Sequence, residues 1–296
     1  MTSRAKARGL IALLRLPYWL MTGGLSLLTA FAITKHPLSL SIQTGLLIFF
    51  SMAFITSAGF AINDYFDRES DAVIKPRRPI PSGALSLKQV VAISSVLFVA
   101  GLVMAFFINW LSFAIIATDS ALLLVYSVIV KLQSGFIANV LVGILTGTAF
   151  MYGEATISTP PTISLISLSL YPIAFGTIGG NVLRDILSLD GDSRIGYPTL
   201  PQKIGVSKSA KVAAVFFLLT GLFAPLPFFA GSFSVYYLLP ILVWSFLLIY
   251  SSIRLVTVSS TVSNVRKYER IVTMSMILLP LALILQALSH MIGGLV

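Results

Sequence analysis

Acidic residues are concentrated in one short stretch of this chain. Only 10 of the 296 residues are Asp or Glu, and four of these lie between positions 63 and 71. Asn63, Asp67 and Asp71 recur at every fourth position, which on a helix aligns their side chains along one face. Such crowded carboxylates repel one another unless a cation neutralises them. Oxygen ligands without His or Cys suit Mg²⁺, so the spacing predicts that Asp67 and Asp71 hold Mg²⁺ together with a phosphate or diphosphate. A solvated acidic helix end is the alternative.

A second acidic cluster lies in the segment 182–207. Asp185, Asp190 and Asp192 occur there, next to Arg184 and Arg194. The two clusters together hold seven of the ten acidic residues. This duplication suggests a pseudo-repeat in which one cluster from each half converges on a shared cavity.

The composition indicates that most of the chain is surrounded by membrane lipid. Apolar residues make up 57% of it, charged residues only 10%, and the mean hydropathy is +0.96, whereas soluble domains carry about 25% charged residues. We therefore predict an all-α polytopic membrane protein, a single domain over residues 1–296, with nine helices around a central cavity that two loops cap. The predicted spans are roughly 10–32, 41–62, 88–108, 111–130, 135–152, 163–181, 208–230, 235–258 and 267–293.

The connections between spans differ in length and polarity. Only Asn109 and Trp110 separate the third and fourth spans, which predicts a tight helical hairpin. The segment 63–87 is long and contains Lys75-Pro76-Arg77-Arg78-Pro79-Ile80-Pro81-Ser82-Gly83. Its prolines and glycine forbid a continuing helix.

The basic residues predict the orientation of the chain. With the N-terminus in the cytoplasm, every Lys and Arg except Lys35 falls on the inner side, as the positive-inside rule requires. The C-terminus and Glu154 then lie outside, Glu154 in solvent, and both acidic loops face the cytoplasm. The basic residues are dispersed through short loops, so a nucleic-acid partner is not expected. We expect membrane lipids as neighbours and no obligate protein partner.

These motifs resemble those of the UbiA superfamily of intramembrane prenyltransferases. Asn63–Asp71 matches the pattern Asn-Asp-x-x-Asp-x-x-x-Asp, and Arg78–Gly83 reads Arg-Pro-Ile-Pro-Ser-Gly, which is also typical of that family. The segment from Asp185 to Asp192 falls where the second acidic motif of the family belongs. The resemblance covers the whole chain and implies Mg²⁺-dependent prenyl transfer, with Asp185 and Asp192 as further metal ligands.

One position departs from the family pattern. The second motif usually reads Asp-x-x-x-Asp and would end at Asp192, so its first Asp would fall on Ser188. Asp185 and Asp190 flank this position, but a shift of two or three residues turns a ligand well away from the original helix face. The sequence leaves open which carboxylate replaces Ser188.

The resemblance also assigns the basic residues. Loss of diphosphate from an allylic substrate leaves a carbocation, and the departing charge needs stabilisation. Asn63 and a set of basic residues are the expected diphosphate ligands: Arg68, Lys75, Arg77, Arg78 and Arg184. Lys131 resembles a catalytic basic position that follows a Tyr in the family, although a Lys at the inner end of a helix needs no function. Asp64 or the released diphosphate would accept the proton from the acceptor.

The acceptor is predicted from the particular residues within the two acidic motifs. Asn-Asp-Tyr-Phe-Asp at 63–67 and Gly-Asp at 191–192 most resemble archaeal members that add a second geranylgeranyl chain to geranylgeranylglyceryl phosphate. We therefore expect transfer from geranylgeranyl diphosphate to this ether-lipid precursor. An aromatic acceptor, as in quinone, haem or chlorophyll synthesis, is the first alternative. A transporter of ions or phosphate is the second, but it would favour charges near the middle of the membrane.

Overall fold

The computed structural model describes residues 3–194, 196–258 and 261–293, and these residues form helices with no strand. Nine stretches of the described residues are long and apolar enough to cross a membrane, which confirms the predicted all-α architecture. They are Lys6–Ile33, Ile42–Phe66, Leu87–Ile108, Trp110–Gln133, Gly135–Ile157, Leu165–Leu187, Val206–Phe229, Val235–Thr257 and Val262–Ile292. We call them spans one to nine.

Several spans consist of more than one helical segment. Spans two, three, five and eight are single helices: α4 (Ile42–Phe66), α6 (Leu87–Ile108), α9 (Gly135–Ile157) and α16 (Val235–Thr257). Span one contains α1 (Ser3–Leu14), α2 (Pro17–Trp19), the π-helix η1 (Leu20–Gly24) and α3 (Leu25–Ile33). Span four contains α7 (Trp110–Val125), the π-helix η3 (Tyr126–Val130) and α8 (Lys131–Gln133). The remaining spans are built from α10 (Leu165–Leu170), η4 (Tyr171–Ala174) and α11 (Phe175–Leu187), from α14 (Val206–Phe223) and α15 (Leu226–Phe229), and from α17 (Val262–Ser275) and α18 (Leu278–Gly293).

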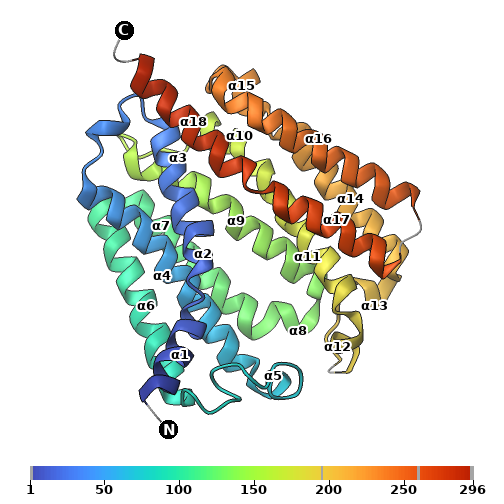
Figure 1. Cartoon of the computed structure of the whole chain (residues 1–296). Coiled ribbons are helices and arrows are strands. Elements are labelled where there is room, and N and C mark those ends of the chain that lie inside the picture. The colour runs from blue at the N-terminus through green and yellow to red at the C-terminus, as the bar shows by residue number, and fades with distance from the viewer. Residues whose placement is uncertain (1–2, 195, 259–260, 294–296) are drawn as a thin grey trace.

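The helices form a closed bundle. Neighbouring pairs such as α4 and α6 pack together, and α18 returns to contact α3 (Figure 1). At this junction the imidazole Nδ1 of His290 lies 2.7 Å from the carbonyl oxygen of Thr34. The backbone N–H of Ser234 donates to Oε1 of Gln286 at 2.8 Å, which ties span nine to the start of span eight.

The predicted hairpin between spans three and four is present and has a simple capping arrangement. Asn109 ends α6 and caps α7, and its Oδ1 accepts a hydrogen bond of 2.8 Å from the N–H of Ser112. Its Nδ2 donates to the carbonyl oxygen of Ala155 at 2.7 Å. One side chain therefore satisfies a helix start and fixes the hairpin against span five.

The polar connections gather at one end of the bundle. The short helices α5 (Arg68–Ile74), α12 (Leu189–Arg194) and α13 (Leu200–Ile204) lie at the end where the described chain begins, and the C-terminal end of α18 lies at the opposite end (Figure 1). The second connection is shorter than predicted. Span six continues to Leu187, so Arg184 and Asp185 stand on the last turns of a helix and not in a loop.

Glu154 is not solvated, contrary to the sequence prediction. Its side chain is buried near the end of α9 and accepts hydrogen bonds from the N–H of Ser164 at 2.8 Å and from the hydroxyls of Ser164 and Ser167, each at 2.5 Å. Both serines lie where α10 begins. The carboxylate therefore links the end of span five to the start of span six.

Small residues set the close spacing of the helices. The core contains many alanines, glycines and serines, whereas large apolar side chains such as Phe106, Phe229 and Phe246 face outward. This distribution is typical of membrane bundles, in which lipid covers the outer face and small residues let backbones approach. A Cβ atom added to Gly153 would lie 2.6 Å from the carbonyl oxygen of Ser26 in the neighbouring α3.

We predict that Gly153→Ala destabilises the protein by about 1–3 kcal/mol, because backbone atoms at the α3–α9 contact would have to separate. Thermal unfolding in detergent micelles measures this. Gly180→Ala is the matched control, since nothing lies within 4 Å of its added Cβ. Equal melting temperatures for the two variants would contradict the close approach of α3 and α9.

Candidate functional site: two carboxylate networks at the mouth of the bundle

The first acidic motif does not lie on one continuous helix. The helix α4 ends at Phe66, Asp67 has φ −83° and ψ 0°, and α5 begins at Arg68. The hydrogen-bond ladder continues across the break, because the N–H of Asp71 donates to the carbonyl oxygen of Asp67 at 2.8 Å. The spacing predicted that Asn63, Asp67 and Asp71 align along one face. Instead, Asn63 and Asp67 belong to one network of polar contacts and Asp71 to another.

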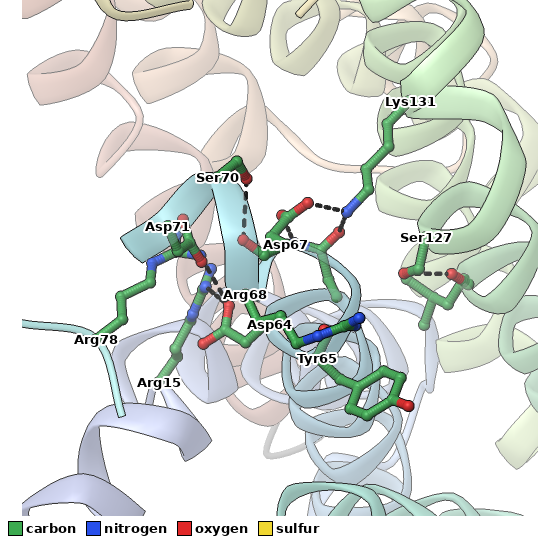
Figure 2. A network of polar contacts seen from close by, with 12 residues as sticks. Arg15, Asp64, Tyr65, Asp67, Arg68, Ser70, Asp71, Arg78, Ser127 and Lys131 are labelled. Atoms are coloured by element: carbon green, nitrogen blue, oxygen red, sulfur yellow. Dashed lines mark hydrogen bonds and ion pairs between the residues drawn. The ribbon is translucent and has the colours of Figure 1, made fainter. Parts of the chain in front are cut away.

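The first network contains Asn63, Asp67 and Lys131. The amide Nδ2 of Asn63 donates to Oδ2 of Asp67 at 2.7 Å. The ammonium of Lys131 donates to Oδ1 of Asn63 at 2.7 Å and also forms an ion pair with Oδ1 of Asp67 (Figure 2). Lys131 is only 3% exposed. Lys131 directly follows the π-helix η3. A π-helical turn changes the register of the residues after it, and Lys131 lies at this change, where its side chain contacts Asp67.

The second network contains Asp64, Asp71, Arg15 and Arg78. The guanidinium of Arg78 lies 2.9 Å from Oδ1 of Asp64 and 2.5 Å from Oδ2 of Asp71. Arg15 forms a further ion pair of 2.6 Å with Oδ1 of Asp64. Figure 2 shows Arg78 and Asp71 on one side of α5 and Asp67 with Lys131 on the other. The two networks therefore lie on different faces of the same motif.

A break in span one positions Arg15. Its φ is +49°, a left-handed conformation that costs a non-glycine residue about 1–3 kcal/mol. The break leaves the carbonyl oxygen of Leu14 free to accept bonds from the hydroxyl of Ser57 at 2.6 Å and from the indole N–H of Trp19 at 3.2 Å. The guanidinium carbon then lies 4.3 Å from the centre of the Phe60 ring. These contacts hold an Arg inside a largely apolar span at the depth of Asp64.

The proline-rich loop positions Arg78 by folding on itself. The N–H of Arg78 donates to the carbonyl oxygen of Lys75 at 2.9 Å, and the N–H of Leu85 donates to that of Pro79 at 3.0 Å. Pro79 is buried, whereas Lys75 and Arg77 are exposed. The loop thus brings three predicted phosphate ligands to the side of Asp64, with only Arg78 engaged in ion pairs.

The two carboxylates of the second acidic motif, Asp185 and Asp192, have different hydrogen-bond partners. The amide Nδ2 of Asn139 in span five donates to Oδ2 of Asp185 at 2.7 Å. Asp192 accepts a hydrogen bond of 2.6 Å from the hydroxyl of Ser188, the residue that departs from the family pattern. Asp190 is exposed. Between the two carboxylates that flank Ser188, only Asp185 is turned toward another span.

Two predicted diphosphate ligands are not brought to either network. Arg184 is exposed, lies 3.9 Å from Glu269 in span nine, and donates to Oδ1 of Asn181 at 3.0 Å. Arg68 donates to the carbonyl oxygen of Tyr65 and to Glu69, each at 3.1 Å. Neither side chain forms a hydrogen bond or an ion pair with Asp67 or Asp71.

Tyr197 is a site residue that the sequence analysis missed. Its N–H donates to the carbonyl oxygen of Asp192 at 3.0 Å, and the next residue, Pro198, accepts from the N–H of Gly135 at 2.9 Å. Burial raises the pKa of its hydroxyl, and Tyr126, Asp185, Asp67 and Asp192 raise it further. The hydroxyl therefore stays protonated at neutral pH. An aromatic residue in a loop of Gly, Pro and charged residues was the available signal.

The donor chemistry of the acidic residues suits a hard cation. Asp67, Asp185 and Asp192 supply carboxylate oxygens, and Asn63 and Asn139 supply amides. Among the described residues no three Asp, Glu or His side chains lie together as a ready ion site. Mg²⁺ does not require such a cage, because it binds through one or two carboxylates together with water and phosphate oxygens.

We predict that Arg15 and Asp64 are energetically coupled, whereas Lys131 and Asp64 are not. A double-mutant cycle of Arg15→Met and Asp64→Asn should give a coupling of about 1–3 kcal/mol, and the cycle of Lys131→Met and Asp64→Asn less than about 0.5 kcal/mol. The free energy of unfolding in mixed micelles provides both values. Similar couplings in the two cycles would mean that the networks act as one.

Comparison with known proteins agrees with this geometry. Residues 19–284 match the UbiA prenyltransferase family. Digeranylgeranylglyceryl phosphate synthase of Natronomonas pharaonis is 36% identical over 235 residues, which cover 79% of this chain and 82% of that protein. The synthase of the same name from Methanocaldococcus jannaschii is 32% identical over 243 residues, or 81% and 83% of the two chains.

Solved structures share the fold. A structure described as digeranylgeranylglyceryl phosphate synthase in membranes superposes with a TM-score of 0.81 at 27% identity, over 96% of this chain and 99% of that one. A UbiA homologue from Archaeoglobus fulgidus, bound to GPP and Mg²⁺, superposes with a TM-score of 0.64 at 18% identity, over 94% and 99% of the chains. With this family match and nine apolar spans among its described residues, the chain belongs to the UbiA prenyltransferase family and is a multi-pass membrane prenyltransferase.

Proposed function

We propose that this enzyme transfers a geranylgeranyl group from geranylgeranyl diphosphate to geranylgeranylglyceryl phosphate. The observation that carries the proposal is the network of Asn63, Asp67 and the buried Lys131, which lies at the same end of an apolar bundle as the second acidic motif (Figure 1). The names of the relatives from Natronomonas pharaonis and Methanocaldococcus jannaschii support the acceptor.

The acidic residues would hold Mg²⁺, as the homologue bound to GPP and Mg²⁺ suggests. We propose Asp67, Asp185 and Asp192 as its ligands. Asp71 would join them after leaving Arg78. The bound ion would act as a Lewis acid on the diphosphate oxygens. The bonds from Asn139 to Asp185 and from Ser188 to Asp192 would meanwhile fix the orientation of these carboxylates.

Other residues would act on the leaving group. Lys131 lies against Asp67 and can donate to a diphosphate oxygen with a small movement of its ammonium group. We propose the hydroxyl of Tyr197, whose backbone N–H bonds to Asp192, as a further donor to the same group. As the allylic C–O bond breaks, its electron pair leaves with the diphosphate. The surrounding apolar spans would exclude water from the carbocation.

The acceptor would then complete the transfer. Its hydroxyl oxygen forms the new bond to the allylic carbon and releases one proton. Asp64 and the released diphosphate are the two candidate bases. Both arginines contact Oδ1 of Asp64, so its Oδ2 is the oxygen that would take the proton.

The orientation in the membrane belongs to the same proposal. We place the described start of the chain and the two polar connections in the cytoplasm and the C-terminal end outside, with residues 1–296 as one domain. The described start of the chain and the polar connections lie at one end of the bundle (Figure 1), and the sequence predicts nearly all Lys and Arg on that side. Both charged substrates would then reach the site from the cytoplasm.

The acceptor is tested by mass spectrometry of products from purified protein supplied with Mg²⁺ and geranylgeranyl diphosphate. The acceptor panel contains geranylgeranylglyceryl phosphate, 4-hydroxybenzoate and dihydroxynaphthoate. We expect a doubly prenylated glycerol phosphate and no prenylated aromatic compound. A prenylated aromatic compound alone would assign the enzyme to an aromatic acceptor instead.

The metal assignment is tested by Asp67→Asn, which keeps the shape of the side chain and removes its charge. We expect turnover to fall by about 100-fold or more, as when a key electrostatic group of an active site is lost. Asp190→Asn is the matched control, because Asp190 lies in the second motif but is exposed and its side chain forms no hydrogen bond or ion pair within the described part of the chain. Turnover of Asp67→Asn within about threefold of wild type would disprove the role of this carboxylate, given the size of such electrostatic effects.

A further inference from the structure

We propose that a cationic pocket formed by Arg15, Lys75, Arg77 and Arg78 binds the phosphomonoester headgroup of the acceptor lipid. The pocket lies on the Asp64 side of the acidic motif and has a volume of about 340 Å³, with Ala12, Asp64 and Pro79 completing its lining. This inference rests on the proposed function and assigns its second substrate to a separate place.

The separation of the two networks is the first argument. The groups suited to the diphosphate, Asp67 and Lys131, lie on one side of α5, whereas Arg78 and Asp71 lie on the other (Figure 2). A two-substrate transfer needs both anions bound at once without direct contact. The division of one short motif between two faces provides two such positions.

The charge of the pocket is the second argument. Four basic residues and one carboxylate line it, and that carboxylate, Asp64, is 3% exposed and already paired with Arg15 and Arg78. Lys75 and Arg77 are exposed and form no side-chain hydrogen bond or ion pair with any described residue. A phosphomonoester carries a charge of about −1.5 to −2 at neutral pH, which matches these two unpaired cations.

The surroundings of the pocket suit a lipid better than a soluble anion. Ala12 lies on α1, and the same helix exposes Leu10 and Ile11, which are 38% and 58% exposed. The helix also borders a second pocket of about 500 Å³ with a largely apolar lining, between α1 and α6. A headgroup bound by Lys75 and Arg77 could therefore keep its hydrocarbon chain on apolar surface.

The position also brings the acceptor near the reaction. Asp64 lines the pocket, and the neighbouring Asn63 bonds to Asp67 in the first network. An acceptor whose phosphate is bound by Lys75 and Arg77 would direct its glycerol hydroxyl toward Asn63 and Asp67. Lys75 and Arg77 thus determine specificity for a phosphorylated acceptor without touching the reacting atoms.

The test is the double variant Lys75→Ala/Arg77→Ala. With mass-spectrometric detection of product, we expect the KM for geranylgeranylglyceryl phosphate to rise about tenfold or more, because charge-assisted bonds to phosphate are lost. We expect the KM for geranylgeranyl diphosphate to stay within about twofold, since the donor binds elsewhere. Lys208→Ala/Lys211→Ala is the charge-matched control, because both lysines are exposed on α14 and do not line the pocket.

A binding measurement makes the outcome independent of turnover. Without donor or Mg²⁺, geranylgeranylglyceryl phosphate should raise the melting temperature of wild type and of the control but not of Lys75→Ala/Arg77→Ala. Inorganic phosphate at equal concentration should raise it less, because it cannot use the apolar surface. A larger effect of inorganic phosphate would assign the pocket to a free anion and overturn the proposal.

The two proposals can fail separately. If wild type makes no glycerol phosphate product, the proposed reaction is wrong, but the melting experiment still decides whether the pocket binds a lipid phosphate. If wild type makes the product while the variant keeps its acceptor KM, the pocket assignment is wrong. A rise in the donor KM alone would mean that Lys75 and Arg77 bind the diphosphate.

Discussion

The structure depends on neutralising carboxylates that are buried at the mouth of an apolar bundle. Asp64 and Asp71 are 3% and 4% exposed, and an unpaired charge at such a position costs several kcal/mol. Arg78 contacts both carboxylates, and Arg15 contacts Asp64 as well. Because these arginines come from span one and from the proline-rich loop, the pairing joins three segments of the chain at the point where the chemistry is expected.

Irregular backbone recurs where these partners must be delivered. Arg15 lies at a left-handed break in span one, Asp67 lies between α4 and α5, and Lys131 follows the π-helix η3. A regular helix would place each side chain at a position dictated by its own register. The interruptions turn Arg15, Asp67 and Lys131 toward residues of other segments, and the strain at Arg15 is offset by the bonds to the Leu14 carbonyl and by its ion pair.

The rest of the bundle is a closely packed frame with a lipid-facing surface. Small residues at contacts such as that of Gly153 with Ser26 bring helices together, and the polar contacts of His290 and Gln286 close the ring at the opposite end. The polar connections lie together at one end of this frame (Figure 1), an arrangement that suits an enzyme whose charged substrates bind at that end.

The sequence alone determined the features that depend on local pattern. Nine apolar runs predicted nine spans, Asn109 and Trp110 predicted the hairpin, and the spacing of Asn63, Asp67 and Asp71 marked the motif. These follow from hydropathy and helical period, which a short window of residues contains.

Only the tertiary structure decided which partner each charged group takes. Asp67 and Asp71 share a motif, yet one pairs with Lys131, 64 residues away, and the other with Arg78. Glu154 was expected in solvent but is buried with Ser164 and Ser167. A carboxylate pairs with whichever donor the packing of other helices brings within about 3 Å, and that distance is not encoded in any local pattern.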